Sequence, residues 1–305
     1  MKQLRVRFGQ PKTHLATGAD GITVDLRMPH LAGPADEVIL RAPGTVESPF
    51  PGSALLAGEG WLAGAFVRPW HGPLDEVALA LYRELLLEAR GWSIGRIWNY
   101  VPDINSETTG LENYRRFNLG RWQAYHDAFG EALASHLPAA SAVGLHDDKL
   151  VAIFIATREP VRRVENPQQV PAWRYPQLYG PKSPSFVRGA AAGANGSRHA
   201  WVSGTASIRG HESLALNDVL GQLAVTVENL DVVLGALSLA PLAAAPEGHR
   251  RFTKVYLRRA ADLEAVRAAF EQSAPPAAGD VMYVQADVCR AELDLEIEVT
   301  ETPSA

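Results

Sequence analysis

The stretch Arg96-Ile97-Trp98-Asn99-Tyr100 decides the fold, because it is strand-like and has a helical pattern on each side. Residues 75–90 carry an apolar stripe at helical spacing, and Gly91 is a plausible end for that helix. Residues 121–136 form the second helical pattern, which Pro138 ends. A strand enclosed by two helices predicts a unit in which helices cover a sheet.

A second unit of the same kind follows later in the chain. The strand-like Thr253-Lys254-Val255-Tyr256-Leu257-Arg258 lies between helical patterns at 213–237 and 261–272. The repeated order predicts an α+β fold with two related halves, residues 1–140 and 141–305, and mixed sheets packed with long helices on one face. We expect the functional site in a cleft between the halves.

Composition excludes several classes of protein. The 305 residues carry 29 Lys and Arg against 34 Asp and Glu, and the formal charge of -5 does not suit a nucleic-acid or polybasic membrane-binding protein. The longest apolar run, residues 150–156, is far below the roughly 18 to 20 residues of a membrane helix. Cys289 is the single cysteine, so an intrachain disulfide or a thiolate zinc site cannot form. We expect a cytoplasmic protein.

The second half contains a segment that is rich in proline, aromatic residues and cations. Five prolines between residues 165 and 196 argue against a regular strand or helix, so we predict an ordered functional loop. On either side, residues 142–145 and 150–156 predict a hairpin, and residues 281–290 and 292–300 predict another at the end of the chain.

Arginine and tyrosine gather in three places, and this favours a small anionic ligand. Arginine can hold a carboxylate with two hydrogen bonds, and tyrosine can orient it. The alternative is that these are surface cations paired with the acidic surplus. The three groups lie before the second helix, in the proline-rich loop, and at the end of a strand: Tyr114, Arg115 and Arg116; Arg174, Tyr175, Tyr179, Lys182 and Arg188; Tyr256, Arg258 and Arg259.

Acidic residues alternate with apolar ones in Leu293-Asp294-Leu295-Glu296-Ile297-Glu298. The pattern favours a half-buried strand with a solvated acidic face. The alternative is that one acid faces the cleft with a raised pKa and can donate a proton. The chain has no phosphate-binding loop, dinucleotide fingerprint, HExxH motif or histidine pair with ligand spacing, so we predict no metal site.

Several motifs together resemble a known family. Residues 203–207, the long helix, 254–258 and 288–298 look like a RidA/YjgF-type (chorismate-mutase-like) domain. More specifically, Arg96–Asn105, Tyr114–Arg121, Pro184–Arg188 and Ser203–Ile208 are similar to the chorismatases. The resemblance covers roughly residues 90 to 300.

The resemblance implies cleavage of the enolpyruvyl ether of chorismate to release pyruvate, without a metal or organic cofactor. A carboxylic acid must deliver a proton to the enol methylene, and Glu296 matches the family's catalytic glutamate. Besides Glu296 and Cys289 as catalytic residues, we expect these substrate-binding residues: Tyr114, Arg174, Tyr175, Tyr179, Arg188, Thr205, Ala206 and Arg258.

The product depends on how the resulting cation collapses. The resemblance to the branch that makes 3-hydroxybenzoate, and in some members 4-hydroxybenzoate, rests on Cys289, seven residues before Glu296. A small buried apolar role for Cys289 is the alternative. Ala206, in contrast, has a methyl group where we expect that branch to have glycine.

Three other interpretations stay open. The chain could hydrolyse chorismate to 3,4-dihydroxycyclohexa-1,5-diene carboxylate, act as a RidA-like imine deaminase, or bind a ligand without catalysis. RidA-type domains commonly form trimers, but two halves in one chain can satisfy part of that packing. We therefore expect either a monomer or a trimer.

Overall fold

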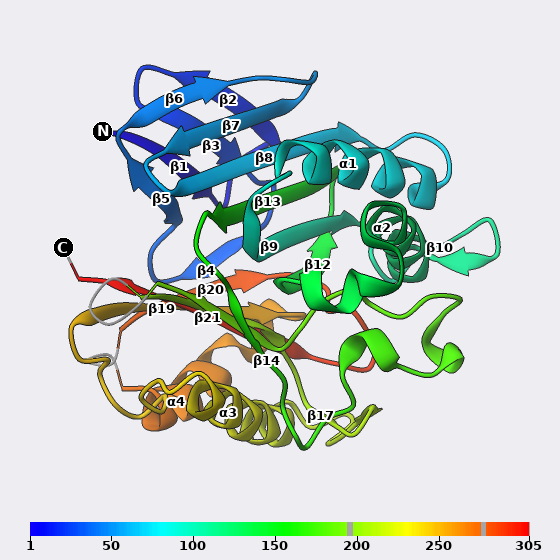
Figure 1. The fold of residues 1–305 in the computed structure, drawn as a ribbon. Helices are drawn as coiled ribbons and strands as arrows, with labels where there is room; N and C mark the ends of the chain where they lie inside the picture. The colour runs from blue at the N-terminus through cyan, green and yellow to red at the C-terminus, as the bar shows by residue number, and fades with distance from the viewer. Residues whose placement is uncertain (194–197, 276–278, 305) are drawn as a thin grey trace.

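The first sheet lies in the upper part of the molecule in Figure 1, with its two helices on the right. The computed structural model describes residues 1–193, 198–275 and 279–304. The strand order is β12-β9-β13-β8-β7-β6, and α1 (Leu74–Glu88) and α2 (Asn113–Phe129) cover one face. The strand bounds are β6 Gly44–Glu47, β7 Ser53–Gly58, β8 Trp61–Pro69, β9 Ser93–Pro102, β12 Ala139–Leu145 and β13 Lys149–Thr157.

The second sheet lies below the first, with α3 (Val219–Ala236) and α4 (Leu263–Ser273) on its outer face (Figure 1). Its strand order is β14-β15-β16-β21-β19-β20-β4. The bounds are β14 Arg162–Val164, β15 Gly189–Ala192, β16 His199–Thr205, β19 His249–Leu257, β20 Asp280–Gln285, β21 Leu295–Pro303 and β4 His30–Ala32.

The two halves repeat one topology. The order β7-β8-α1-β9-α2-β12-β13 along the chain corresponds to β15-β16-α3-β19-α4-β20-β21, and the strand positions in the sheets correspond as well. The predicted α+β fold with two related halves is confirmed. The predicted boundary near residue 140 needs correction, because β12 and β13 belong to the first sheet and the junction follows Thr157.

Both predicted hairpins are wrong for the same reason. Strand β9 lies between β12 and β13, and β19 lies between β20 and β21. In each half a helix crosses over the sheet and returns the chain parallel to the strand that precedes it, so β9 pairs with β12 and β19 with β20 in parallel. The last strand of each half then pairs antiparallel with that same preceding strand.

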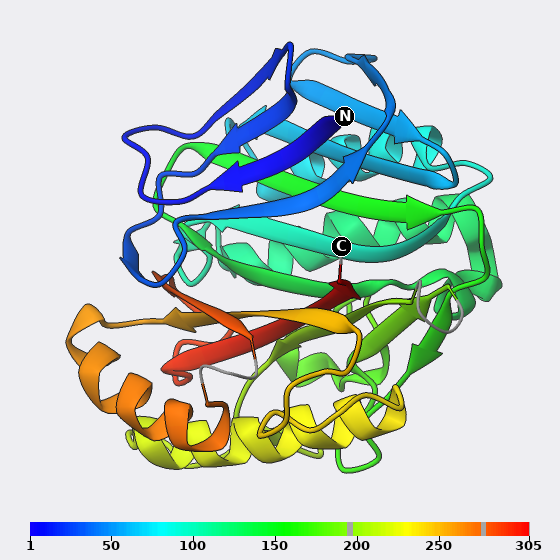
Figure 2. The same ribbon diagram turned by 90° about the vertical axis from the view of Figure 1, so that its left-hand side faces the viewer.

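Four strands within the first 42 residues form a third sheet, shown in blue at the top of Figure 2. Its order is β2-β3-β1-β5, and its apolar side chains join those of the inner faces of both large sheets in one core. Short β4 then extends the second sheet beside β20. The bounds are β1 Lys2–Arg7, β2 His14–Gly18, β3 Gly21–Asp25 and β5 Asp36–Ala42.

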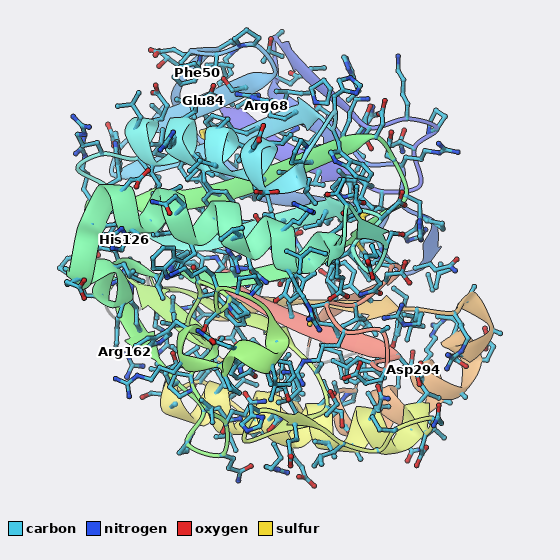
Figure 3. All side chains as sticks on the ribbon, turned by 90° about the vertical axis from the view of Figure 1, so that its right-hand side faces the viewer. Phe50, Arg68, Glu84, His126, Arg162 and Asp294 are labelled. Atoms are coloured by element: carbon cyan, nitrogen blue, oxygen red, sulfur yellow. The ribbon has the colours of Figure 1, made fainter. Side chains whose placement is uncertain are left out.

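The helices bury regular apolar stripes on the outer faces of the sheets. In α1, Leu74, Ala78, Leu81 and Leu85 are buried at intervals of three or four residues. An ion pair between Arg68 of β8 and Glu84 of α1 joins this helix to its sheet (Figure 3). Helix α3 is long and apolar enough to cross a membrane by length and composition; here its buried leucines and Val233 pack on the second sheet.

The proline-rich segment is irregular up to residue 188, apart from the 3-10 turns η2 (Ala172–Arg174) and η3 (Gln177–Tyr179). The loop prediction is wrong at β15, whose four residues contain no proline and can therefore donate to β16. Residues 194–196 of the predicted loop lie outside the described residues. The remaining short elements are η1 Gly130–His136, η5 Ala260–Asp262, β10 Glu107–Thr108, β11 Leu111–Glu112, β17 Ile208–Arg209 and β18 Glu212–Ser213.

Candidate active site

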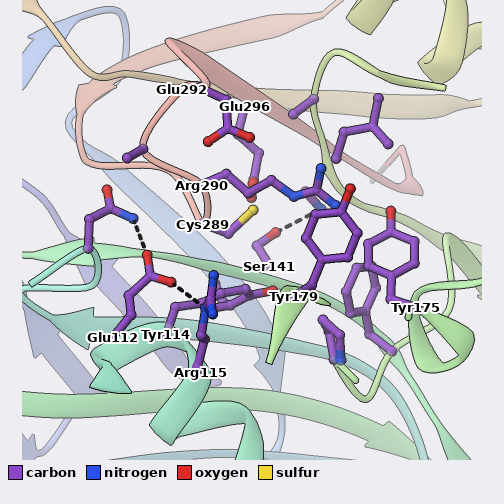
Figure 4. A pocket seen from close by; sticks show the side chains of 18 of the residues that line it. Glu112, Tyr114, Arg115, Ser141, Tyr175, Tyr179, Cys289, Arg290, Glu292 and Glu296 are labelled. Carbon is purple, nitrogen blue, oxygen red and sulfur yellow. Dashed lines mark hydrogen bonds and ion pairs between the residues drawn. The ribbon is translucent and has the colours of Figure 1, made fainter. Parts of the chain in front are cut away.

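A cavity of about 480 Å³ opens between the start of α2, strand β12, the proline-rich loop and the end of the second sheet (Figure 4). This volume suits a small-molecule ligand. The lining residues with polar or aromatic side chains are Asn105, Glu107, Glu112, Tyr114, Arg115, Arg121, Ser141, Tyr175, Tyr179, Phe186, Arg188, Cys289, Arg290, Glu292 and Glu296.

Glu296 reaches the cavity because of the alternation in β21. Leu295 and Ile297 pack under α3 and α4, so the acids between them point to the inner side of the sheet. The expectation of a solvated acidic face is wrong, because Glu296 is only 4% exposed. Its Oε1 atom is buried and has no hydrogen-bond partner within residues 1–193, 198–275 and 279–304.

The carboxyl group of Glu296 lies directly over the backbone of β16. A Cβ atom added to Gly204 would lie 1.9 Å from Oε1 and 2.6 Å from the Cδ atom of Glu296. Only glycine therefore lets the carboxyl group occupy this position. Gly204 also donates its backbone N–H to the hydroxyl of Ser141 at 3.0 Å, which fixes the strand beside the cavity.

The surroundings of Glu296 favour its neutral form. Burial raises its pKa most, and the negative charge of Glu298 raises it further, while Arg96 and Arg188 lower it. The resulting pKa is about 8, against an ordinary value of 4.5. Glu296 is therefore mainly a carboxylic acid at neutral pH and can donate a proton.

Cys289 lies beside Glu296 in the loop that leads from β20 to β21 (Figure 4). Burial raises the pKa of its thiol to about 12, with the nearby Glu296 as the next cause. At neutral pH the group is a thiol rather than a thiolate, so it is a weak nucleophile. Its side chain forms part of the cavity wall next to Glu296.

Three arginines line the cavity with unsatisfied donors. Arg121 and Arg188 each have a buried Nε atom, and Arg290 a buried NH2 atom, without a hydrogen-bond partner in the described part of the chain. Guanidinium groups can hold carboxylates with two hydrogen bonds, so three arginines at one cavity favour an anionic ligand. Two arginines are fixed on their other side: Arg188 donates to the hydroxyl of Tyr175 at 2.7 Å, and Arg290 to the carbonyl of His211 at 2.9 Å.

Aromatic rings form the wall that the proline-rich loop contributes. The guanidinium carbon of Arg290 lies 4.0 Å from the ring centre of Tyr179, and the hydroxyl of Tyr179 is hydrogen-bonded to His211 at 3.1 Å. Tyr175 and Tyr179 are 5.5 Å apart between ring centres. Stacking on Arg290 holds this wall against the loop that carries Cys289.

Seven of the ten predicted site residues line the cavity: Glu296, Cys289, Tyr114, Tyr175, Tyr179, Arg188 and Ala206. Three do not and are corrected. Arg174 is exposed and stacks on Trp173 with 4.3 Å between its guanidinium carbon and the ring centre. The hydroxyl of Thr205 is buried and donates to the carbonyl of Ser203.

Arg258, the third correction, holds the loop of Cys289 from behind. Its guanidinium donates to Asp287 at 2.6 Å, to Asn105 at 3.0 Å and to the backbone carbonyls of Arg290 and Leu293 at 2.9 and 2.8 Å. These bonds use the donors that a substrate would need, so its role is structural support.

Sequence reasoning missed Arg121, Arg290, Ser141 and Gly204 as site residues. Arg290 is next to Cys289, and that position was a usable signal. Arg121 lies two helical turns after Tyr114, so the two side chains lie on the same face of α2. Ser141 and Gly204 carried no signal, because their importance comes from contacts between β12, β16 and β21.

Comparison with known proteins identifies relatives with named activities. The family model described as chorismatase FkbO/Hyg5-like, N-terminal, matches residues 44–156. A 3-hydroxybenzoate synthase of Streptomyces hygroscopicus is 37% identical over 245 residues, which cover 75% of this chain and 70% of that protein. A chorismatase of the same organism is 34% identical over 256 residues, covering 81% and 73%. A chorismatase crystal structure matches with a TM-score of 0.87 at 28% identity, covering 97% of this chain and 92% of that one.

Proposed function

The chain belongs to the chorismatase family of enzymes, and on this premise we propose that it cleaves the enolpyruvyl ether of chorismate to pyruvate and 3-hydroxybenzoate. The observation that carries the proposal is the neutral carboxyl group of Glu296, buried at a cavity with three incompletely satisfied arginines. Chorismate carries two carboxylates and an enol ether, and these groups need cations and a proton donor, respectively.

In the first step Glu296 donates its proton to the terminal methylene carbon of the enol ether. The electron pair of the carbon–carbon double bond forms the new C–H bond, and the ether carbon becomes an oxocarbenium ion. With a pKa of about 8, about nine-tenths of Glu296 is protonated at pH 7, and the acid is close to the strength that suits proton transfer there.

In the second step the hydroxyl oxygen on the neighbouring ring carbon displaces the ether oxygen, whose electron pair completes the carbonyl group of pyruvate. The hydroxyl proton leaves, and an epoxide bridges the two ring carbons. The epoxide then opens at the carbon that first carried the hydroxyl group, a hydrogen with its electron pair shifts to that carbon, and transfer of a ring proton to the oxygen gives the aromatic 3-hydroxybenzoate. One proton enters and one leaves, so the reaction needs no net water. Arg121, Arg188 and Arg290 are suited to hold the substrate carboxylates in register with Glu296.

Cys289 supports the aromatising product over hydrolysis. A neutral thiol next to Glu296 offers a water molecule little hydrogen bonding, so it disfavours a water placed to attack the cation. The similarity to a 3-hydroxybenzoate synthase is in keeping with this choice. The glycine that lies against Glu296 is Gly204. Ala206, where we expected glycine in the aromatising branch, also lines the cavity.

Incubation of the purified protein with chorismate tests the proposal, with pyruvate measured and the ring product identified by chromatography. We expect equal amounts of pyruvate and 3-hydroxybenzoate. Pyruvate with the dihydroxydiene would assign the hydrolytic branch instead. Ammonia release from an imino acid, without turnover of chorismate, would assign the deaminase. Glu296→Gln, which keeps the shape of the side chain but removes the acid, is the matched control and should be inactive.

A further inference from the structure

Glu296 and Glu298 on β21 point to the same side of the sheet, but they differ in hydrogen bonding. Glu298 accepts hydrogen bonds from the guanidinium of Arg96 at 2.7 Å, from Trp98 Nε1 at 2.8 Å and from the ammonium of Lys254 at 2.8 Å. Glu296, two residues earlier, has an Oε1 atom without a partner in the described residues. The two buried cations Arg96 and Lys254 thus form their ion pairs with Glu298 and not with Glu296.

The group around Glu298 reaches through all three sheets. Arg96 comes from β9, Lys254 from β19, and the ammonium of Lys254 also lies 2.7 Å from the carboxylate of Glu37 in β5. Each of these four side chains is at most 6% exposed. Buried charges persist only with such compensation, so the position of each one is fixed by the others.

We propose that Glu298 is a positioning residue for the reaction: it draws Arg96 and Lys254 away from Glu296, and its own fixed negative charge keeps Glu296 in the neutral, proton-donating form. This inference rests on the proposed function, because it assigns the cause of the acid's reactivity. It also gives the N-terminal sheet, through Glu37, a place in the electrostatics of the site.

Distance and charge support this arrangement. Alternate residues of a strand are about 6.6 Å apart, and at an effective dielectric constant of about 20 a unit charge at that range shifts a pKa by more than about one unit. Burial alone would raise the pKa of Glu298, but Lys254 and Arg96 lower it below its ordinary value, so its charge is present. Glu298 is the largest charge effect on the pKa of Glu296.

Other titratable groups around Glu296 do not reproduce this effect. Arg96 and Arg188 lower its pKa, while burial keeps Tyr114, Tyr256 and Cys289 neutral by raising theirs. The remaining charged groups that line the cavity are Glu107, Glu112, Arg115 and Arg121 in and before the first half of α2, and Arg290 and Glu292 of the loop before β21.

Titration of Glu296 itself tests the proposal independently of activity. In protein labelled with carboxyl-¹³C glutamate, infrared difference spectra report protonation, and the Glu296 signal is the one missing from Glu296→Gln. We expect Glu298→Gln to lower the pKa of Glu296 by at least about one unit. The alkaline limb of the chorismate pH–rate profile should move down with it.

Glu301→Gln is the matched control. Glu301 is equally buried on β21, forms an ion pair with Arg251 at 2.6 Å, and lies three residues after Glu298, on the opposite face of the strand. Its loss should destabilise the fold in a similar way but leave the pKa of Glu296 unchanged. A merely structural role for Glu298 predicts equal behaviour of the two variants.

If Glu298→Gln does not fold, the double variant Glu298→Gln/Lys254→Met is tested in its place. It removes one buried charge of each sign. The negative charge is the nearer one to Glu296, so a smaller downward shift is expected. An unchanged pKa of Glu296 in either folded variant overturns the proposal. Chorismate turnover by the wild-type protein, with no pKa shift in the variants, would reject this inference alone. A pKa shift in the variants, with no chorismate turnover by the wild-type protein, would reject the proposed function alone.

Discussion

Gly204→Ala should remove most of the activity while leaving the fold intact. The new methyl group would lie 1.9 Å from Oε1 of Glu296, where an ordinary contact is about 3.4 Å. The carboxyl group must therefore move by about 1.5 Å, because Ser141, at 3.0 Å from the same methyl position, is held by Arg96 and Glu298. A displacement of about 1 Å from the reacting atoms costs about 100-fold in rate.

The assay is steady-state turnover of chorismate, with kcat and KM separated and thermal unfolding measured on the same preparations. The loss should fall on kcat, because the three cavity arginines proposed to bind the substrate are unchanged. Gly235→Ala is the matched control: it adds the same methyl group on the exposed side of α3, where no atom lies within 4 Å. It should keep wild-type kcat. Wild-type kcat in Gly204→Ala would refute the placement of the acid.

Three further predictions concern the acid and the loop beside it. Activity should fall as pH rises through about 8, where Glu296 loses its proton. Stability should also depend on pH, because the pKa of Glu296 is raised in the folded state. The contribution of Glu296 to the free energy of unfolding is greatest below its unfolded-state pKa of about 4.5, and it is lost as pH rises toward 8. Denaturant unfolding at pH 5 and pH 8.5 should show this loss in wild type but not in Glu296→Gln. Cys289→Ala should change the ratio of ring products more than KM, as measured by chromatography; an unchanged ratio would remove the cysteine from product control. Arg258→Met should lower stability by on the order of 2 kcal/mol and raise KM, because the loop of Cys289 loses its hydrogen bonds to this side chain; calorimetry showing wild-type stability would contradict this.

The repeated order of helices and strands was readable from the sequence, but the pairing of the strands was not. Apolar runs such as residues 150–156 predict a buried strand. They do not say that β9 will come between β12 and β13, since that depends on the path of α2 across the sheet. The prediction of hairpins followed from closeness in the sequence, and the crossover helices override it.

The candidate site, like the fold, could be predicted from the sequence only in part. Alternation in β21 predicts that Glu296 and Glu298 share a face, but not that this face is buried between two sheets. Arg174 and Arg188 look equivalent in the sequence of the loop. Only the structure shows that Arg188 points to the cavity while Arg174 stacks on the surface against Trp173.

The most direct measurement of the central claim is chorismate turnover in D₂O, with the pyruvate trapped by reduction to lactate as it forms. Protonation of the methylene carbon by Glu296, whose acidic proton exchanges with solvent, predicts one deuterium in the methyl group of each lactate. Glu296→Gln should form none. Lactate with a fully protiated methyl group would mean that the hydrogen comes from the substrate ring, and no pyruvate at all would contradict the proposed function.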